Sequence, residues 1–466
     1  MKNFAQFTKL FFLMAGLICI ISCSDDDNTI IIPEPTSNIV ELAESTNELS
    51  DLVDALTKFP DLVELLSNDG AYTVFAPTND AFDALLAAIG QTDINDIPED
   101  VLKNVLQYHV FTAAAVESTA VTTGSITMAN GESAALVSNT NGVTAQGAQV
   151  ILPDVMGTNG IVHVINNVMV PPSILPIVGT IVAPAYFNKE FTTLIAAVQA
   201  ADPSILELLL SNGPNNNGLT LFAPTNDAFT AAGITDLSAV VDVVDAVLAY
   251  HVIDGTIMKD MLPTSGIAAT GVPTLGGNIY VTNNGGDVSI NGTTTVIATD
   301  ITGSNGVVHV IDRTLLPPTN TINEIVGSFT SGNPGEFTLL AAALSRAGLA
   351  DFFSGDGPYT VFAPTDAAFL AAGLDEAAIN ATDPAAVAGI LTHHVVEPNA
   401  YVFSTDLTDG AVPMLNGQDV TISLGSLTVQ DAAGSNPAAG LVASLLNVFA
   451  TNGVIHVIDK VLLPSS

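Results

Sequence analysis

Histidine is the residue type in this chain whose placement could support chemistry near neutral pH, because the imidazole titrates there and also binds metal ions. The seven histidines all fall within two signatures of a repeated pattern. Two histidines per repeat could meet across a fold, but zinc needs three or four ligands, and no His-x-Glu motif or suitable cysteine accompanies them. We therefore predict hydrogen-bonded core histidines and no metal site. They are His109, His163, His251, His309, His393, His394 and His456.

Other patterns of catalytic residues do not occur in the sequence. It contains no Gly-x-Ser-x-Gly motif for a serine nucleophile and no phosphate-binding loop. Acidic residues recur near a helix start at Asp80 and Asp227, but the third repeat has Ala367 there, and helix capping explains the other two. The sequence has no calcium-binding loop motif, so any calcium would bind weakly at the surface. We predict a protein that is not an enzyme and uses no cofactor.

The elements that position the histidines belong to a unit repeated three times, with a period of roughly 143 residues that suits whole domains. Three signatures recur in the same order. The first is Tyr72-Thr-Val-Phe-Ala-Pro-Thr-Asn-Asp-Ala-Phe82, matched at residues 219–229 and 359–369. The second is Tyr108-His109-Val110, matched by Tyr250-His251-Val252 and less closely by His393-His394-Val395. The third runs from Asn159-Gly160 to Ile165, matched at 305–311 and 452–458.

The local patterns predict an α+β unit. Residues 72–75 form a β-prone run that Pro77 ends, and Thr78 is placed to cap a helix with an apolar stripe from Phe82 to Ile89. Leucines between 52 and 66 predict a pair of short helices upstream. Asn159-Gly160 indicates a tight turn, followed by a strand that is apolar on both faces. Alternating runs such as 278–300 predict β-hairpins.

The charge of the chain excludes one class of partner. It carries 9 Lys and Arg against 47 Asp and Glu, a net charge of −38. Nucleic acids and anionic lipid headgroups attract clustered Lys and Arg, so we predict no nucleic-acid partner. Hydrophobic residues make up 48% of the chain, which predicts folded domains and not a disordered chain.

Residues 1–22 are typical of an export signal. Positive charge at Lys2 and Lys9 precedes an uncharged run that is too short to span a membrane as a helix. Ile20-Ile21-Ser22 before Cys23 resembles a bacterial lipobox, which implies cleavage before Cys23 and lipid attachment to it; the alternative is a simple secretory signal. The other cysteine, Cys19, would leave with the signal, so the exported domains would contain no disulfide.

Residues 23–37 are predicted to be an acidic, lipidated tether. The run Ser24-Asp25-Asp26-Asp27 resembles the export tag of surface lipoproteins in Bacteroidetes-type bacteria; the alternative is that the aspartates only solvate a linker. Pro33 and Pro35 suit a flexible linker in either case. We expect a chain anchored to the outer membrane only by its lipid and facing the cell exterior.

The three signatures together are similar to the fasciclin domain family, over roughly residues 37–466. The resemblance implies three compact α+β domains, each a β-wedge or sandwich with a helical layer, at residues 38–172, 173–319 and 320–466. Pro171-Pro172 and Pro317-Pro318 would restrict the orientation of neighbouring domains.

The resemblance also implies a role in cell adhesion and matrix assembly, with other surface or matrix proteins or polysaccharides as partners. In animal relatives the Tyr-His region is implicated in receptor contact, which maps onto Tyr108, His109, Tyr250 and His251. The third unit departs from this pattern at His393. A buried tyrosine with a hydrogen-bonded hydroxyl is the alternative for this region.

A second functional hypothesis is a non-catalytic module that captures an envelope polysaccharide or a small ligand. The chain has no tryptophan and 6% aromatic residues, which speaks against broad sugar platforms.

Overall fold

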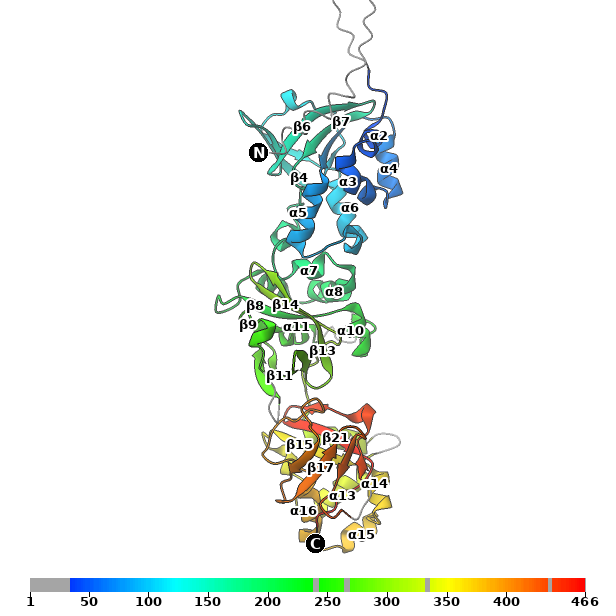
Figure 1. Ribbon diagram of the computed structural model, residues 1–466, viewed down its shortest axis with the longest axis vertical. Helices are drawn as coiled ribbons and strands as arrows, with labels where there is room; N and C mark the ends of the chain where they lie inside the picture. The colour runs from blue at the N-terminus through cyan, green and yellow to red at the C-terminus, as the bar shows by residue number, and fades with distance from the viewer. Residues whose placement is uncertain (1–33, 238–242, 264–268, 332–335, 435–437, 466) are drawn as a thin grey trace, which may run out of the picture.

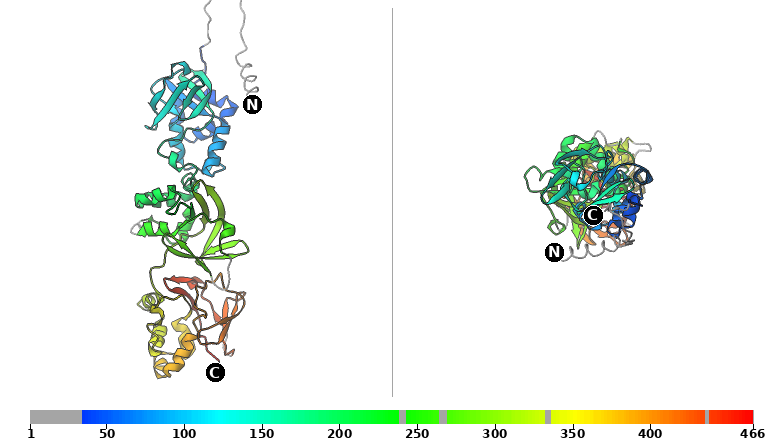
Figure 2. Two further views of the ribbon diagram at one scale, coloured as in Figure 1. Left: turned by 90° about the vertical axis from the view of Figure 1, so that its left-hand side faces the viewer. Right: turned by 90° about the horizontal axis from the view of Figure 1, so that it is seen from above.

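The computed structural model describes residues 34–465, except for 238–242, 264–268, 332–335 and 435–437. Three domains are stacked end to end in chain order to form an elongated rod (Figure 1). Figure 2 shows the same stacking from the side and the slender outline of the rod from above. We call the elements from α2 to β7 domain 1, those from α7 to β14 domain 2, and those from α12 to β21 domain 3.

Domain 1 begins with short helices, as predicted. Helix α2 (Ile39–Glu44) starts with a capping box, in which Asn38 and Glu41 each accept a hydrogen bond from the other's backbone N–H. Helices α3 (Ser50–Leu56) and α4 (Pro60–Ser67) follow, and their apolar residues pack into the core.

The first signature forms the predicted strand, cap and helix. Strand β1 (Tyr72–Pro77) is buried along its whole length. Helix α5 (Asn79–Ile89) begins after Thr78, whose hydroxyl accepts a hydrogen bond from the N–H of Ala81. Helix α6 (Glu99–Gln107) completes the helical layer and ends at the second signature.

The sheet of domain 1 has seven strands in the order β2-β1-β7-β6-β5-β4-β3. Strand β7, the third signature, lies parallel to β1, with Tyr72 opposite Gly160 and Pro77 opposite Ile165. The remaining neighbours are antiparallel, as expected for hairpins. These strands are β2 (Val110–Phe111), β3 (Gly124–Thr127), β4 (Ser133–Asn139), β5 (Gly142–Ala145), β6 (Ala148–Gly157) and β7 (Gly160–Ile165).

Domain 2 repeats this architecture strand for strand. Its sheet has the order β10-β11-β12-β13-β14-β8-β9, and β8 and β14 form the parallel pair. The hairpins predicted over 278–300 are present as β11 to β13. Its elements are α7 (Ala183–Tyr186), α8 (Thr192–Ala200), α9 (Pro203–Leu210), β8 (Leu219–Pro224), α10 (Asn226–Ala231), α11 (Val244–Tyr250), β9 (Val252–Asp254), β10 (Thr270–Thr274), β11 (Gly277–Asn284), β12 (Asp287–Ile290), β13 (Thr294–Gly303) and β14 (Gly306–Ile311).

Domain 3 keeps the parallel pair, β15 and β21, but its strands divide into two sheets, β15-β21-β20 and β16-β17-β18-β19. Isolated bridges link them, one of them between Leu441 and Ile458. Its elements are α12 (Ile322–Thr330), α13 (Thr338–Arg346), β15 (Tyr359–Pro364), α14 (Asp366–Ala371), α15 (Glu376–Ala381), α16 (Pro384–Thr392), β16 (Gly410–Pro413), β17 (Asp419–Ser423), β18 (Thr428–Gln430), β19 (Ala439–Gly440), β20 (Val448–Ala450) and β21 (Gly453–Ile458). The helices and mixed sheets confirm the predicted α+β class.

Domains 1 and 2 share one hydrophobic core. A single cluster of buried side chains runs from α2 through the connecting segment to β14. Phe187, which follows α7 and is 2% exposed, lines the same small apolar space as Phe82 of α5 and Leu102 of α6. Because Phe187 packs beside side chains of domain 1, the junction contributes to the stability of both domains.

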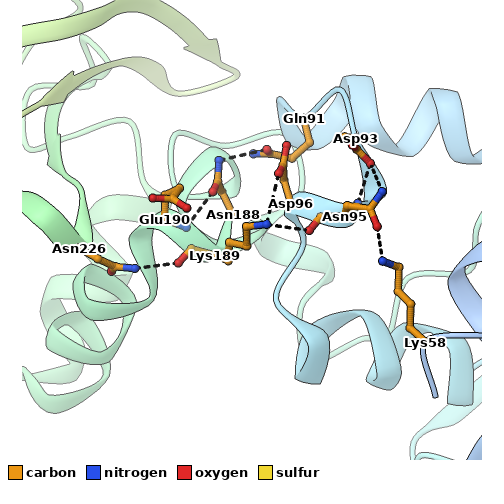
Figure 3. A network of polar contacts seen from close by, with 9 residues as sticks. All are labelled: Lys58, Gln91, Asp93, Asn95, Asp96, Asn188, Lys189, Glu190 and Asn226. Atoms are coloured by element: carbon orange, nitrogen blue, oxygen red, sulfur yellow. Dashed lines mark hydrogen bonds and ion pairs between the residues drawn. The ribbon is translucent and has the colours of Figure 1, made fainter. Parts of the chain in front are cut away.

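Polar contacts surround this apolar junction (Figure 3). The amide of Asn188 donates a 3.2 Å hydrogen bond to Gln91 Oε1. Lys189 Nζ donates to the carbonyl of Asn95 at 3.3 Å and lies 3.8 Å from a carboxylate oxygen of Asp96. Since these charges are exposed to solvent, they orient the two domains more than they stabilise them.

The junction between domains 2 and 3 is aromatic. The ring of Tyr280, on β11, lies 4.1 Å from the ring of Tyr401 and also contacts Phe403 and Phe449 of domain 3. Beside these rings, the hydroxyl of Thr282 donates a 2.6 Å hydrogen bond to the buried carboxylate of Asp406. Burial raises the pKa of Asp406, because desolvation disfavours the charged form.

Candidate functional site

The tyrosine of the second signature connects the helical layer to the sheet. Tyr108 ends α6, and its hydroxyl donates a 2.8 Å hydrogen bond to the carbonyl of Ser133. Tyr250 makes the corresponding bond to the carbonyl of Asn278. Burial raises the pKa of both tyrosines to about 12, so they are neutral donors.

The histidine of this signature links the helix to the segment that follows the last strand. His109 Nδ1 lies 2.7 Å from the carbonyl of Val105, and His109 Nε2 accepts a 2.8 Å hydrogen bond from the N–H of Met169. The carbonyl requires a proton on Nδ1 and the N–H requires none on Nε2, so the ring is neutral. His251 and His394 make the same pair of contacts. Desolvation lowers the pKa of all three rings to about 4.

The histidine of the third signature supports an irregularity in the strand beside it. His163 Nε2 lies 2.9 Å from the carbonyl of Val116, and Nδ1 accepts a 3.2 Å hydrogen bond from the N–H of Asp154. Asp154 has a left-handed φ of 60° where the register of β6 shifts, and the imidazole takes the N–H that the ladder leaves free. His309 and His456 hold the corresponding N–H groups in domains 2 and 3.

His393 is the exception, at the position where the other two domains have tyrosine. Its Nδ1 lies 3.0 Å from Asn416 Oδ1, whereas its buried Nε2 has no hydrogen-bond partner. An imidazole is shorter than a phenol and does not reach the backbone carbonyl that the tyrosines use. The prediction of hydrogen-bonded core histidines is therefore confirmed for the other six histidines.

All four residues predicted for receptor contact are buried. Tyr108, His109, Tyr250 and His251 have between 0% and 2% of their surface exposed. Their side-chain polar atoms are occupied by the contacts above, so in this conformation they support the fold from within. A role for them in binding remains a prediction that would involve the surface around the helix end.

No three His, Cys, Asp or Glu side chains gather into a group that could hold a metal ion anywhere in the described residues. An acidic hollow, about 540 Å³ in volume, lies between α3 and the end of α5. Burial, together with Asp83 and Asp54, raises the pKa of Asp51 there. Lys58 lines the same hollow and supplies positive charge beside these carboxylates.

Sequence reasoning missed the asparagine of the third signature. Asn159 accepts a 3.0 Å hydrogen bond from the N–H of Ile39, at the start of α2, and its amide donates to the carbonyls of Leu66 and Asn68, at the end of α4. Asn305 and Asn452 repeat all three contacts in their domains. The Asn-Gly pair does turn the chain, but the side chain also ties the start of α2 to the end of α4.

The N-terminal predictions lie mostly outside the described residues. Cys23 and the acidic run after it precede residue 34, where the description begins. Within the described parts of the chain, no helix has both the length and the apolar character needed to cross a membrane.

The family model of the fasciclin domain matches the chain three times, at residues 47–171, 189–317 and 335–464. These matches cover most of the chain and include the three signatures of each domain. The chain belongs to the fasciclin domain family, as the resemblance predicted.

Relatives come from animals and bacteria. The chain is 28% identical over 406 residues to the transforming growth factor-beta-induced protein ig-h3 of Sus scrofa, covering 86% of this chain and 54% of that protein. It is 30% identical over 312 residues to human periostin, covering 65% of this chain and 34% of periostin. It is 40% identical over 144 residues to protein sll1483 of Synechocystis, covering 30% of this chain and 74% of that protein. The chain thus spans about half the length of the Sus scrofa relative.

A solved FAS1 domain pair from the insect cell adhesion molecule fasciclin I overlaps 59% of this chain and 97% of its own, at 19% identity and a TM-score of 0.28.

Proposed function

We propose that this chain is a surface protein that mediates adhesion or organises extracellular matrix through its three fasciclin domains. The observation that carries the proposal is the stacking of three domains of one family into a single rod with two packed junctions. Repeated modules held in series raise the effective concentration of each binding surface for the next, so weak individual sites give strong overall attachment.

We further propose that lipid on Cys23 attaches the chain to the outer membrane, with the domains facing the cell exterior. The lipobox-like run before Cys23 and the acidic run after it support this location. The partners would be cell-surface or matrix proteins or polysaccharides. The boundaries proposed from the sequence, at residues 172 and 319, fall in the proline-containing connectors.

Protease shaving of intact cells tests the location. We expect the chain to be degraded while a periplasmic control protein stays intact. Complete protection of the chain would contradict exterior display and would favour a role in organising the envelope.

Deletion of the chain tests the function. We expect reduced attachment to surfaces and weaker biofilm cohesion, restored by the full chain supplied in trans. Unchanged attachment and cohesion in cells that lack the chain would contradict the adhesion role.

A further inference from the structure

The junction between domains 2 and 3 encloses a cavity of about 170 Å³ beside the aromatic contacts. The segment after β14 and the start of β13 line one side, and Phe449 of domain 3 lines the other. Thr293 and Leu316 are exposed at its rim, so the cavity opens to solvent.

Arg313 supplies positive charge to this cavity in a protein that is otherwise strongly acidic. One of its five N–H groups is used, in a 2.5 Å hydrogen bond from Nη1 to the carbonyl of Ala231. No carboxylate of the described residues lies within ion-pair distance of Arg313. The neighbouring Asp312 accepts a hydrogen bond from the N–H of Thr295 instead. Arg313 is half-buried as a residue, and most of its guanidinium donors have no hydrogen-bond partner among the described residues.

Thr314 has a polar side chain at a position where the other two domains have valine. Its hydroxyl is buried beside the cavity and has no hydrogen-bond partner. The corresponding residues are Val168 in domain 1 and Val461 in domain 3, since the next residue in each domain donates its N–H to the signature histidine. An unpartnered buried hydroxyl costs stability, and because its oxygen is closed to solvent it offers no hydrogen bond to a ligand in the open cavity.

We propose that this cavity binds a small hydroxylated carboxylate of sugar type, namely a single uronate residue. The planar guanidinium of Arg313 matches a carboxylate with two parallel hydrogen bonds. The hydroxyls of Thr293 and Thr294 suit the ring hydroxyls, and the ring of Phe449 offers an apolar face to the C–H groups of the sugar.

Because the protein is strongly acidic, it repels a phosphate with two negative charges more than a carboxylate with one. At physiological ionic strength the screening length is about 8 Å, so distant carboxylates weaken the binding of a single carboxylate only slightly. The site is independent of the adhesion role, because it lies in the junction and requires no contact with another cell.

Titration calorimetry of the full chain with sodium glucuronate tests the proposal, with glucose and inorganic phosphate as comparison ligands. We expect saturable glucuronate binding in the millimolar range and at least tenfold weaker binding of both comparison ligands. Absence of saturable glucuronate binding, or equal binding of glucose or phosphate, would overturn the proposal. Neither result bears on attachment or biofilm cohesion, so the two proposals fail separately.

Substitutions by the residues of the other domains locate the site. Arg313→Asn, which installs the counterpart Asn167, should weaken glucuronate binding at least tenfold, and Arg313→Lys should weaken it severalfold because the bidentate fork is lost. Thr314→Val removes a hydroxyl that a ligand in the cavity does not reach, so it should leave binding unchanged while the melting temperature stays the same or rises. Lys460→Asn, at the equivalent position of domain 3, is the matched control and should leave binding unchanged. Parental affinity in folded Arg313→Asn or Arg313→Lys would contradict the site.

Discussion

At the scale of single residues, the histidines of the signatures work as neutral donors and acceptors inside the core. Each ring of the Tyr-His signature joins a helix carbonyl to an N–H beyond the last strand, which no charged imidazole could do, because both of its nitrogens would donate. Because these imidazole rings are buried, protonating them costs free energy.

The first prediction is therefore a loss of stability in mild acid. The pKa values of His109, His251, His394 and His456 are about 4 in the folded chain, against about 6.5 when unfolded. Between these values the unfolded chain binds more protons, so the stabilisation is complete above pH ~6.5 and is lost as the pH falls toward 4. Each histidine should lower the free energy of unfolding by ~1.4 kcal/mol per pH unit in this window.

Urea unfolding from pH 7 to pH 5 measures this effect, because carboxylates with ordinary pKa values titrate mainly below this range. The fall should persist in high salt, since it arises from desolvation and not from surface charge. A free energy of unfolding that stays constant over these two pH units would show that the rings accept protons without loss of structure.

The second prediction concerns the asparagine of the third signature. Asn305→Ala removes the partners of Ile181 N–H and of the carbonyls of Leu209 and Ser211. We expect a loss of about 2–3 kcal/mol in the stability of domain 2, measured by urea unfolding. The control Asn217→Ala removes an exposed amide and should change stability by less than ~0.5 kcal/mol. Similar effects of the two changes would argue against a structural role for the buried amide.

At the scale of elements, the parallel pair of first and last strands sets the geometry of each domain. Gly160 lies opposite Tyr72 at the start of this pair, and a Cβ built on it would be 2.5 Å from the carbonyl oxygen of Tyr72. The corresponding glycines of domains 2 and 3 face the same obstacle. Glycine is required here because the two backbones approach too closely for any side chain.

The third prediction follows from this close approach. Gly160→Ala should lower the stability of domain 1 by about 2 kcal/mol or more, because β1 and β7 must separate to admit the methyl group. Gly124→Ala, in edge strand β3 with open space around its Cβ, is the matched control and should be nearly neutral. Thermal unfolding of both variants makes the comparison, and equal melting temperatures would mean that the pair tolerates the separation.

Short-range elements could be predicted from the sequence, whereas their pairing could not. The strand, cap and helix around Thr78 depend on neighbours a few residues away, so proline, threonine and the apolar spacing suffice to indicate them. The partners of Asn159 lie between 91 and 120 residues away, and an Asn-Gly pair signals only its local turn. The unpartnered hydroxyl of Thr314 likewise needed the structure, because a Thr for Val change is visible in the sequence but its burial is not.

At the scale of the whole molecule, the domains depend on one another through their junctions. The fourth prediction is that Phe187→Ala destabilises domain 1 as well as domain 2, by about 3 kcal/mol in total, because the ring fills space between α5 and α6. Leu175→Ala, in the same connector but 49% exposed, should have little effect. Hydrogen exchange of the α5 and α6 amides reads out domain 1 directly, and unchanged protection there would show that the two domains fold independently.

The parallel pairing of β1 with β7 also bears on how the rod behaves under tension. Once the leading helices are pulled away, force enters at the start of β1 and leaves at the end of β7, at opposite ends of a ladder of six residue pairs. A load in this direction shears all the rungs together, whereas a hairpin pulled from its open end would unzip one rung at a time. The pairs β8 with β14 and β15 with β21 have the same geometry, so the chain contains three such shear-resistant strand pairs in series. In the proposed adhesive role, attachment would therefore persist up to a threshold force, beyond which one domain would extend while the others stay folded.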